Sequence, residues 1–407
     1  MTTIIYQYVV IWVSGGLHGL AQSSGTKPIT QAGTSYGNVC LAILLALSLF
    51  KIFHNRKSII AIKPKRLMIY CLLLVFSLFY YHTTSVSALF IAAIIGLALQ
   101  NEKAHNYLVI FGVLALIFFS IQIIGISTGI ISDSVILRTT ADNAIPRHTL
   151  GFGYPNRAFA FLLPAWLGIY CIRKTLPKAI LLSACGLFFA YTYLITDTKT
   201  VLILAIALAI SPITKMLLEK NKTLSKASTV LFPLLTFFSI GLALFAGKNW
   251  NSKLNQILSF RPGFWYKYVS GGFSLIGPSS SNKILFATGQ NPLDNLYLSQ
   301  LYRGGIVFYI LICALFLFFS TQLVQSKNYT VMVIVINYLV YSLSESQFSL
   351  ITVLFLPLMF ATILNKAVII DDNCMHNKLS RNEGKEFLNF NRFFSRKISR
   401  RLAPRKY

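Results

Sequence analysis

Residues 107–125 read YLVIFGVLALIFFSIQIIG, an apolar run without a charged side chain. A helix rises about 1.5 Å per residue, so this run would be roughly 28 Å long, close to the hydrocarbon thickness of a bilayer. Peptide groups in that layer have no water to bond, and a helix satisfies all of them internally. The run therefore predicts a membrane-spanning helix.

Similar apolar stretches precede and follow this run along most of the chain. Of the 407 residues, 55% are hydrophobic and 12% are charged, and the mean hydropathy is +0.64. This composition excludes an ordinary soluble domain and predicts an all-α integral membrane protein. Counting 107–125, about twelve stretches have the length of a transmembrane helix. The others centre on residues 4–20, 38–53, 67–81, 85–99, 155–172, 179–195, 201–218, 229–246, 302–323, 330–343 and 348–364.

Lysine and arginine residues gather in alternate connections, which indicates the orientation of the chain. These basic connections lie at residues 51–66, 173–178, 215–226 and 327, all on one side of a twelve-span arrangement. Because positive loops stay in the cytoplasm, we expect both termini to be cytoplasmic. The sequence thus divides into a transmembrane domain, residues 1–366, and a basic cytoplasmic tail, residues 367–407.

The same arrangement explains the formal net charge of +26. Most of the cations lie in the basic connections or in the tail, where they face the anionic lipids of the inner leaflet. We therefore expect membrane lipids as partners and no binding of nucleic acid.

Three long connections lie on the opposite, outer side, at residues 21–37, 131–154 and 247–301. The second contains most of RHTLGFGYPNR, residues 147–157, which leads directly into an apolar stretch. Arginines on the outer side run against the positive-inside pattern, so they indicate an anionic ligand there. Phosphates are the obvious candidates.

Four short motifs occur in order along the chain. They are residues 150–156 (LGFGYPN), 196–200 (TDTKT), 259–265 (SFRPGFW) and 294–298 (DNLYL) followed by 304–306 (GGI). Taken together, they resemble elements of the bacterial O-antigen and capsular polysaccharide polymerases, the Wzy family. The resemblance covers residues 138–345. Tyr154 and Lys199 depart from the pattern, since Asn and Arg are usual at these positions.

The resemblance implies a GT-C-like glycosyltransferase architecture in the bacterial cytoplasmic membrane. Such a polymerase joins undecaprenyl-diphosphate-linked oligosaccharide repeat units at the outer face and releases undecaprenyl diphosphate, with flippase and chain-length regulator proteins as partners. Two alternatives stay open. One is an O-antigen ligase-type glycosyltransferase, although related ligases have a His where Asp294 stands. The other is a lipid-linked oligosaccharide flippase, which the scarcity of charge inside the apolar stretches disfavours.

A diphosphate leaving group needs cations held ready where negative charge grows. The candidate substrate-binding residues are Arg147, Asn156, Arg157, Lys199, Arg261, Asn295, Tyr297 and Arg303. The attacking hydroxyl needs a base, for which Asp294 is the first candidate, Glu345 the second and His148 the third. The sequence has no outer Asp-x-Asp or His cluster, so we expect a metal-independent reaction without a cofactor.

Overall fold

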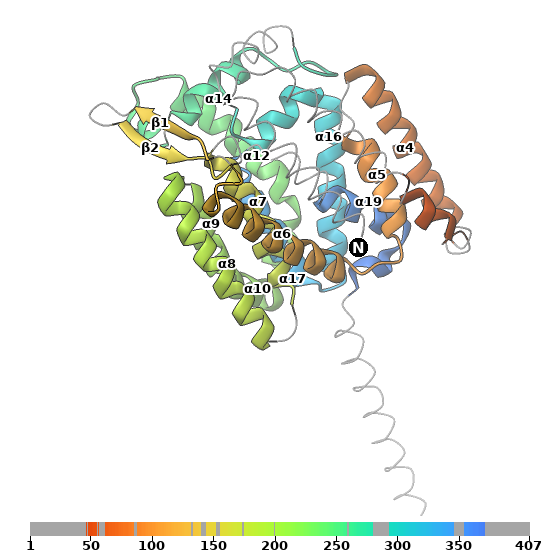
Figure 1. Ribbon diagram of the computed structural model, residues 1–407. Helices are drawn as coiled ribbons and strands as arrows, with labels where there is room; N and C mark the ends of the chain where they lie inside the picture. The colour runs from red at the N-terminus through yellow and green to blue at the C-terminus, as the bar shows by residue number, and fades with distance from the viewer. Residues whose placement is uncertain are drawn as a thin grey trace, which may run out of the picture.

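The computed structural model describes residues 46, 48–54, 56, 62–84, 88–131, 133–139, 144–151, 155–172, 175–198, 200–258, 260–279, 293–345 and 354–370. Within these ranges the chain is mostly helical (Figure 1). In chain order the elements are α4 (Pro64–Thr84), α5 (Ala88–Leu99), α6 (Ala104–Ser127), β1 (Val135–Thr139), β2 (Ala144–His148), α7 (Pro155–Tyr170), α8 (Thr175–Thr196), α9 (Thr200–Ala209), α10 (Ser211–Lys220), α11 (Lys222–Ala227), η1 (Ser228–Val230), α12 (Leu231–Leu242), η2 (Ala243–Gly247), α13 (Lys253–Ile257), α14 (Arg261–Ser270), α16 (Leu296–Gln325), α17 (Tyr329–Tyr341), α19 (Leu356–Leu364) and η4 (Lys366–Ile369).

Among the described residues, five helical stretches are long and apolar enough to cross a membrane. They are Pro64–His82, Ala104–Ser127, Leu176–Thr196, Lys222–Gly247 and Leu296–Gln325. Each contains one predicted span, which confirms the expectation of a helical membrane protein. The predicted span 4–20 lies outside the described residues, as do most of 38–53 and the start of 348–364. The count of twelve stays a prediction.

Several helices turn large apolar side chains outward. Leu72 on α4, Leu187 and Leu194 on α8, and Phe237 and Phe245 on α12 and η2 are between 63% and 83% exposed. Apolar surface left in water costs about 25 cal/mol per Å², whereas surface left in hydrocarbon does not. These outward faces therefore fit a bundle surrounded by lipid.

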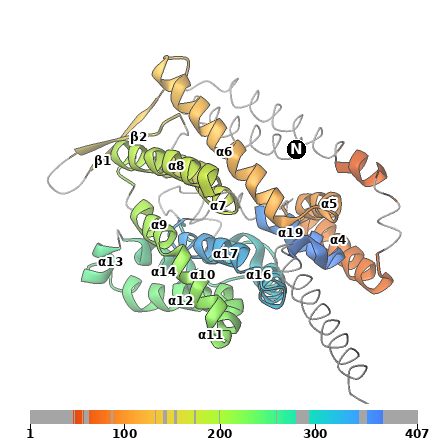
Figure 2. The same cartoon turned by 90° about the horizontal axis from the view of Figure 1, so that it is seen from below.

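Helix α16 lies between two groups of helices. α12 and α17 pack on one side of it, and α19 packs on the other, where α4 and α5 join it (Figures 1 and 2). α6 pairs with α7, which in turn contacts α8. This arrangement brings the ends of α12 and α17 near the start of α16, while the end of α8 lies beside β2.

Helix α16 is broken at Gly305, whose φ of 78° no residue with a Cβ adopts readily. The peptide groups freed by the break are bonded by the segment 274–277. Ile306 N donates to the Ser274 carbonyl at 3.0 Å, and Gly277 N donates to the Gly304 carbonyl at 3.0 Å. The break thereby holds the connection after α14 against α16.

The predicted span 201–218 is two helices rather than one. α9 ends at Ala209 and α10 begins at Ser211, with Ile210 in a turn between them. Pro212 accounts for the interruption, because it has no amide hydrogen for the helical ladder and its ring crowds the preceding turn.

The predicted outer connections contain regular structure that the sequence did not indicate. β1 and β2 form an antiparallel hairpin in which Val135 pairs with His148, and the hairpin projects at the edge of the bundle (Figure 1). This sheet is a departure from a purely helical fold. The connection 247–301 includes α13 and α14, and its last residues already belong to α16.

Candidate functional site

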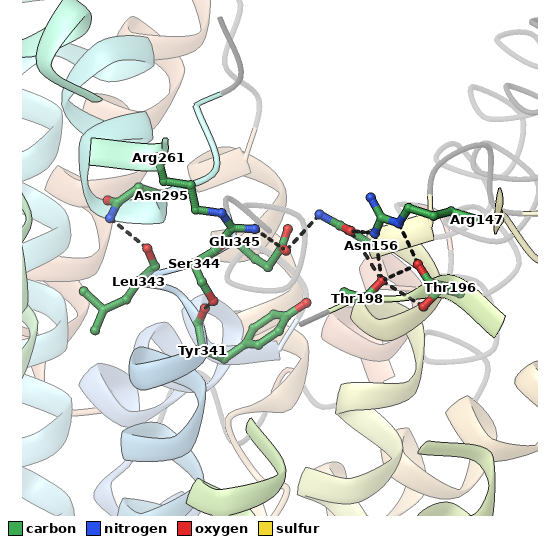
Figure 3. Close-up of polar contacts among 10 residues, drawn as sticks. All are labelled: Arg147, Asn156, Thr196, Thr198, Arg261, Asn295, Tyr341, Leu343, Ser344 and Glu345. Carbon is green, nitrogen blue, oxygen red and sulfur yellow. Dashed lines mark hydrogen bonds and ion pairs between the residues drawn. The ribbon is translucent and has the colours of Figure 1, made fainter. Parts of the chain in front are cut away.

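Arg147 connects the hairpin to the helical bundle. It lies on β2 opposite Ile136. Its Nε donates to the Thr196 carbonyl oxygen at 2.7 Å, and its Nη2 donates to Asn156 Oδ1 at 2.9 Å and to Thr198 Oγ1 at 3.2 Å (Figure 3). One guanidinium thus joins the hairpin, the first turn of α7 and the connection after α8.

Asn156 bridges this arginine to a carboxylate. Pro155 begins α7, a position where its fixed φ suits the helix and its missing amide hydrogen costs little. The Asn156 side chain accepts from Arg147 through Oδ1 and donates through Nδ2 to Glu345 Oε1 at 3.1 Å. An amide can bind a cation and an anion at the same time because it carries both an acceptor and donors.

Glu345 and Arg261 form a buried ion pair beyond Asn156. Arg261 Nη2 lies 3.5 Å from Glu345 Oε1, and the two side chains are 19% and 4% exposed. Arg261 Nη1 also donates to the Ser344 carbonyl oxygen (Figure 3). A buried carboxylate is costly unless opposite charge and hydrogen bonds compensate, and Glu345 has both. We name Arg147, Asn156, Arg261 and Glu345 the charged network.

A compact turn before α14 holds Arg261 in place. Phe260 precedes it in the left-handed region, with φ at 60°, and its ring stacks on Trp250 at a centroid distance of 5.4 Å. Asn255 Oδ1 accepts from the Gly263 amide at 2.9 Å, which ties α13 to the first turn of α14. Trp250 therefore packs against the turn that carries the arginine.

Unusual backbone conformations flank the charged network. Leu150, Asp197 and Phe260 have positive φ angles of 50°, 44° and 60°, and they lie in the connections before α7, after α8 and before α14. Left-handed conformations of residues with a Cβ are unfavourable and persist where the surrounding structure enforces them, often at functional sites. Their location marks this end of the bundle as a candidate site.

Asn295 and Tyr297, both predicted to bind substrate, bond to protein partners. Asn295 caps the first turn of α16, and its Nδ2 donates to Ser239 Oγ and to the Leu343 carbonyl, both at 3.0 Å. The Tyr297 hydroxyl donates to the Leu339 carbonyl at 2.6 Å. These bonds fasten the start of α16 to the end of α17 and so support the turn that carries the buried carboxylate.

Asp294 lies beside the charged network, in a second group that includes Arg303. Burial raises the pKa of the Asp294 carboxyl above its ordinary value, and the charge of Arg261 partly offsets this. Burial also raises the pKa of Tyr268 to about 12, with smaller effects of Tyr302, Arg303 and Asp294. Asp294 is therefore within electrostatic reach of Arg261, and Tyr268 within reach of Asp294 and Arg303.

His148, the third candidate base, lies apart from the charged network. It follows Arg147 on a strand, where successive side chains face opposite sides. Its Nδ1 is 2.6 Å from Asp133 Oδ2, and Asp133 Oδ1 accepts from the Leu150 amide at 2.8 Å. This pair ties the base of the hairpin to the turn before α7.

The side chains of two predicted cations lie outside the described part of the structure. Arg157 belongs to the first turn of α7, but its side chain is not described, and Lys199 falls in a gap between the described ranges. Among the residues that are described, no three His, Cys, Asp or Glu side chains gather as metal ligands would.

Three polar residues that hold the charged network were not among the predicted site residues. Thr196 and Thr198 accept from Arg147, and Ser344 accepts from Arg261. The motif TDTKT contained both threonines, so the motif was a usable signal for them. Ser344 acts through its backbone carbonyl, which no side-chain pattern reveals.

The fold and this site define a helical membrane protein with a buried arginine–asparagine–glutamate network at one end of its bundle. Comparison with protein-family models, with curated proteins and with solved structures finds no match to the chain. The function is therefore argued from the charged network and from the motifs that contribute to it.

Proposed function

We propose that this protein is a polysaccharide polymerase that joins undecaprenyl-diphosphate-linked oligosaccharide repeat units at the outer face of the bacterial cytoplasmic membrane. The charged network carries the proposal, because it joins Arg147 and Arg261, from distant segments of the chain, to the buried Glu345. All four motifs that resemble the Wzy family contribute residues in or beside this network, which supports the resemblance.

In the proposed reaction a hydroxyl oxygen at the nonreducing end of one repeat unit attacks the anomeric carbon of another. A new glycosidic bond forms, the bond from that carbon to the diphosphate oxygen breaks, and undecaprenyl diphosphate leaves with the electron pair. Negative charge grows on the diphosphate, so donors already fixed in place are the main requirement. Arg147 and Arg261 suit this role, since a guanidinium matches phosphate oxygens with paired donors.

The hydroxyl proton requires a base, and Asp294 suits this role better than Glu345. Glu345 Oε1 is already bonded by Asn156 and paired with Arg261, so protonation would compete with both contacts. Burial raises the pKa of the Asp294 carboxyl, which makes it a stronger proton acceptor than an ordinary aspartate.

The test is to incubate the purified full chain in lipid nanodiscs with a lipid-linked repeat unit and to separate the products by size. We expect a ladder of lengthened glycans. Asp294→Asn should remove most turnover and leave donor binding largely intact, because the carboxylate acts on the proton in the transition state. Lys51→Ala, far from the charged network, is the matched control and should give a normal ladder.

Two results would contradict the proposal. Movement of the lipid-linked unit across the membrane without a ladder would identify a flippase. Transfer of a finished glycan to a separate acceptor, without repeated elongation, would identify a ligase.

A further inference from the structure

Tyr341 is a buried residue whose hydroxyl has no hydrogen-bond partner among the described residues. It ends α17, four residues before Glu345, and its side chain is 1% exposed. Buried tyrosine hydroxyls normally find a partner, because an unsatisfied donor retains the cost of leaving water without a compensating bond. The orphaned hydroxyl therefore needs an explanation.

The position of this hydroxyl supplies one. Tyr341 is close enough to Glu345, Arg261 and Asp294 for their charges to act on it. Figure 3 shows the phenol directed from the Glu345 side of the charged network toward the side that holds Arg147 and Asn156. The hydroxyl thus faces the region between the two arginines.

We propose that the Tyr341 hydroxyl donates a hydrogen bond to a phosphoryl oxygen of a diphosphate bound between Arg147 and Arg261. The inference rests on the proposed function for the nature of the ligand. Each guanidinium is anchored by a backbone carbonyl, that of Thr196 for Arg147 and that of Ser344 for Arg261. A tetrahedral oxyanion has more acceptor atoms than two anchored guanidinium groups satisfy, and a neutral donor adds a contact without adding charge.

Entry of a diphosphate between the two arginines requires the contact between Asn156 and Glu345 to open. The Asn156–Glu345 hydrogen bond, 3.1 Å long, joins the two halves of the charged network above the phenol. An incoming diphosphate is an acceptor for the same Asn156 amide and the same Arg261 guanidinium, so it can take the place of the Glu345 carboxylate. The buried hydroxyl is then uncovered as the ligand enters.

The test compares Tyr341→Phe with a matched control, Tyr70→Phe. Tyr70 is also buried in a helix, but its hydroxyl donates to the Ala93 carbonyl at 2.6 Å, far from the charged network. Both variants of the full chain are placed in nanodiscs. Their unfolding midpoints are measured without ligand, and their affinities are measured for inorganic pyrophosphate and for undecaprenyl diphosphate added to the bilayer.

We expect the two variants to respond in opposite ways. Tyr341→Phe should keep or raise the ligand-free unfolding midpoint, because it removes an unsatisfied donor. It should weaken the binding of both ligands about tenfold, the equivalent of one hydrogen bond to a charged acceptor. Tyr70→Phe should lower the midpoint and leave both affinities unchanged. Weaker binding of undecaprenyl diphosphate alone would mean that the hydroxyl contacts only a lipid-bound diphosphate. Weaker binding of both ligands would show that the diphosphate itself is recognised.

Three outcomes would overturn the inference: unchanged affinities in Tyr341→Phe, a midpoint or an insertion defect in that variant as large as in Tyr70→Phe, or no binding of either ligand by the wild type. A different result would contradict the proposed function. A wild type that binds diphosphate through Tyr341 but forms no glycan ladder would retain this inference and lose the polymerase.

Discussion

The two ends of the bundle each carry an ion pair, and the pairs differ in burial. Lys51 Nζ lies 2.7 Å from Glu102 Oε1, near the start of α6, with side chains 33% and 46% exposed. The Arg261–Glu345 pair is longer, at 3.5 Å, yet its carboxylate is only 4% exposed and also accepts from Asn156. From distance alone, the Lys51–Glu102 pair would be expected to interact more strongly. The deeper burial of the Arg261–Glu345 pair reverses this expectation.

Exposed pairs contribute little, commonly about 0–1 kcal/mol, because water and salt screen them. Buried pairs are costly to form and costly to break. A fold that needed only stability could fill the space around Glu345 with apolar side chains. The presence of the buried pair at the hairpin end therefore calls for a functional explanation, whereas the presence of the exposed pair does not.

The largest expected difference between the ends is in activity. Arg147→Ala and Arg261→Ala should each lower polymerisation at least a hundredfold, about the loss seen when one donor to a developing anion is removed. Lys51→Ala should stay near the wild-type rate. The rate of ladder formation, normalised to inserted protein, is the measurement, and near-normal rates in both arginine variants would remove the charged network from the site.

A second difference is expected in stability. Glu345→Ala should lower the free energy of unfolding by about 3 kcal/mol, because it removes the carboxylate partner of the mostly buried Arg261 guanidinium. Glu102→Ala should lower it by less than about 1 kcal/mol. Denaturant unfolding of both variants in the same detergent compares them, and equal losses would mean that burial does not distinguish the two ends.

The length of the apolar stretches was enough to predict a helical membrane protein and the position of the five long helices among the described residues. Hydropathy works here because a lipid-embedded backbone must be helical over its whole width. It failed at Pro212, where one apolar stretch is two helices, and at the hairpin, where Val135 and Ile136 lie in a segment too short to show strand alternation.

The candidate site was predicted in part. Arg147, Asn156, Arg261 and Glu345 were all named from the sequence, and the structure brings them together. The contacts among these four side chains could not be predicted, because they depend on which helix ends lie next to one another in the fold. The same limit applies to Tyr297, whose motif suggested a substrate contact, while its hydroxyl bonds to the neighbouring helix α17.

A smaller effect is expected where α14 packs against η2. A Cβ added to Gly247 would overlap the Pro262 carbonyl oxygen, so Gly247→Ala should push α14, and with it Arg261, away from the bundle. Overpacking of this kind costs about 1–3 kcal/mol. Gly241 lies on the same helical stretch with nothing within 4 Å of an added Cβ, so Gly241→Ala is the matched control.

Gly247→Ala should lower both the free energy of unfolding and the polymerisation rate, and Gly241→Ala should lower neither. If the two alanine variants behave alike, the close approach of α14 is not what positions the arginine, and the difference between the two ends of the bundle must arise elsewhere.

The smallest effect separates the two faces of the hairpin. His148 and Arg147 are adjacent on β2, yet His148 bonds to Asp133 at the base of the hairpin, while Arg147 reaches the charged network. The His148 side chain is 41% exposed, so its pair with Asp133 has the modest value of a surface contact, and His148→Ala should leave the polymerisation rate within about fivefold of wild type. Asp133→Asn should have a similar effect, since it weakens the same contact from the other side. A hundredfold loss in His148→Ala, matching that of Asp294→Asn, would make the histidine the base and would require the hairpin to turn its other face toward the substrate.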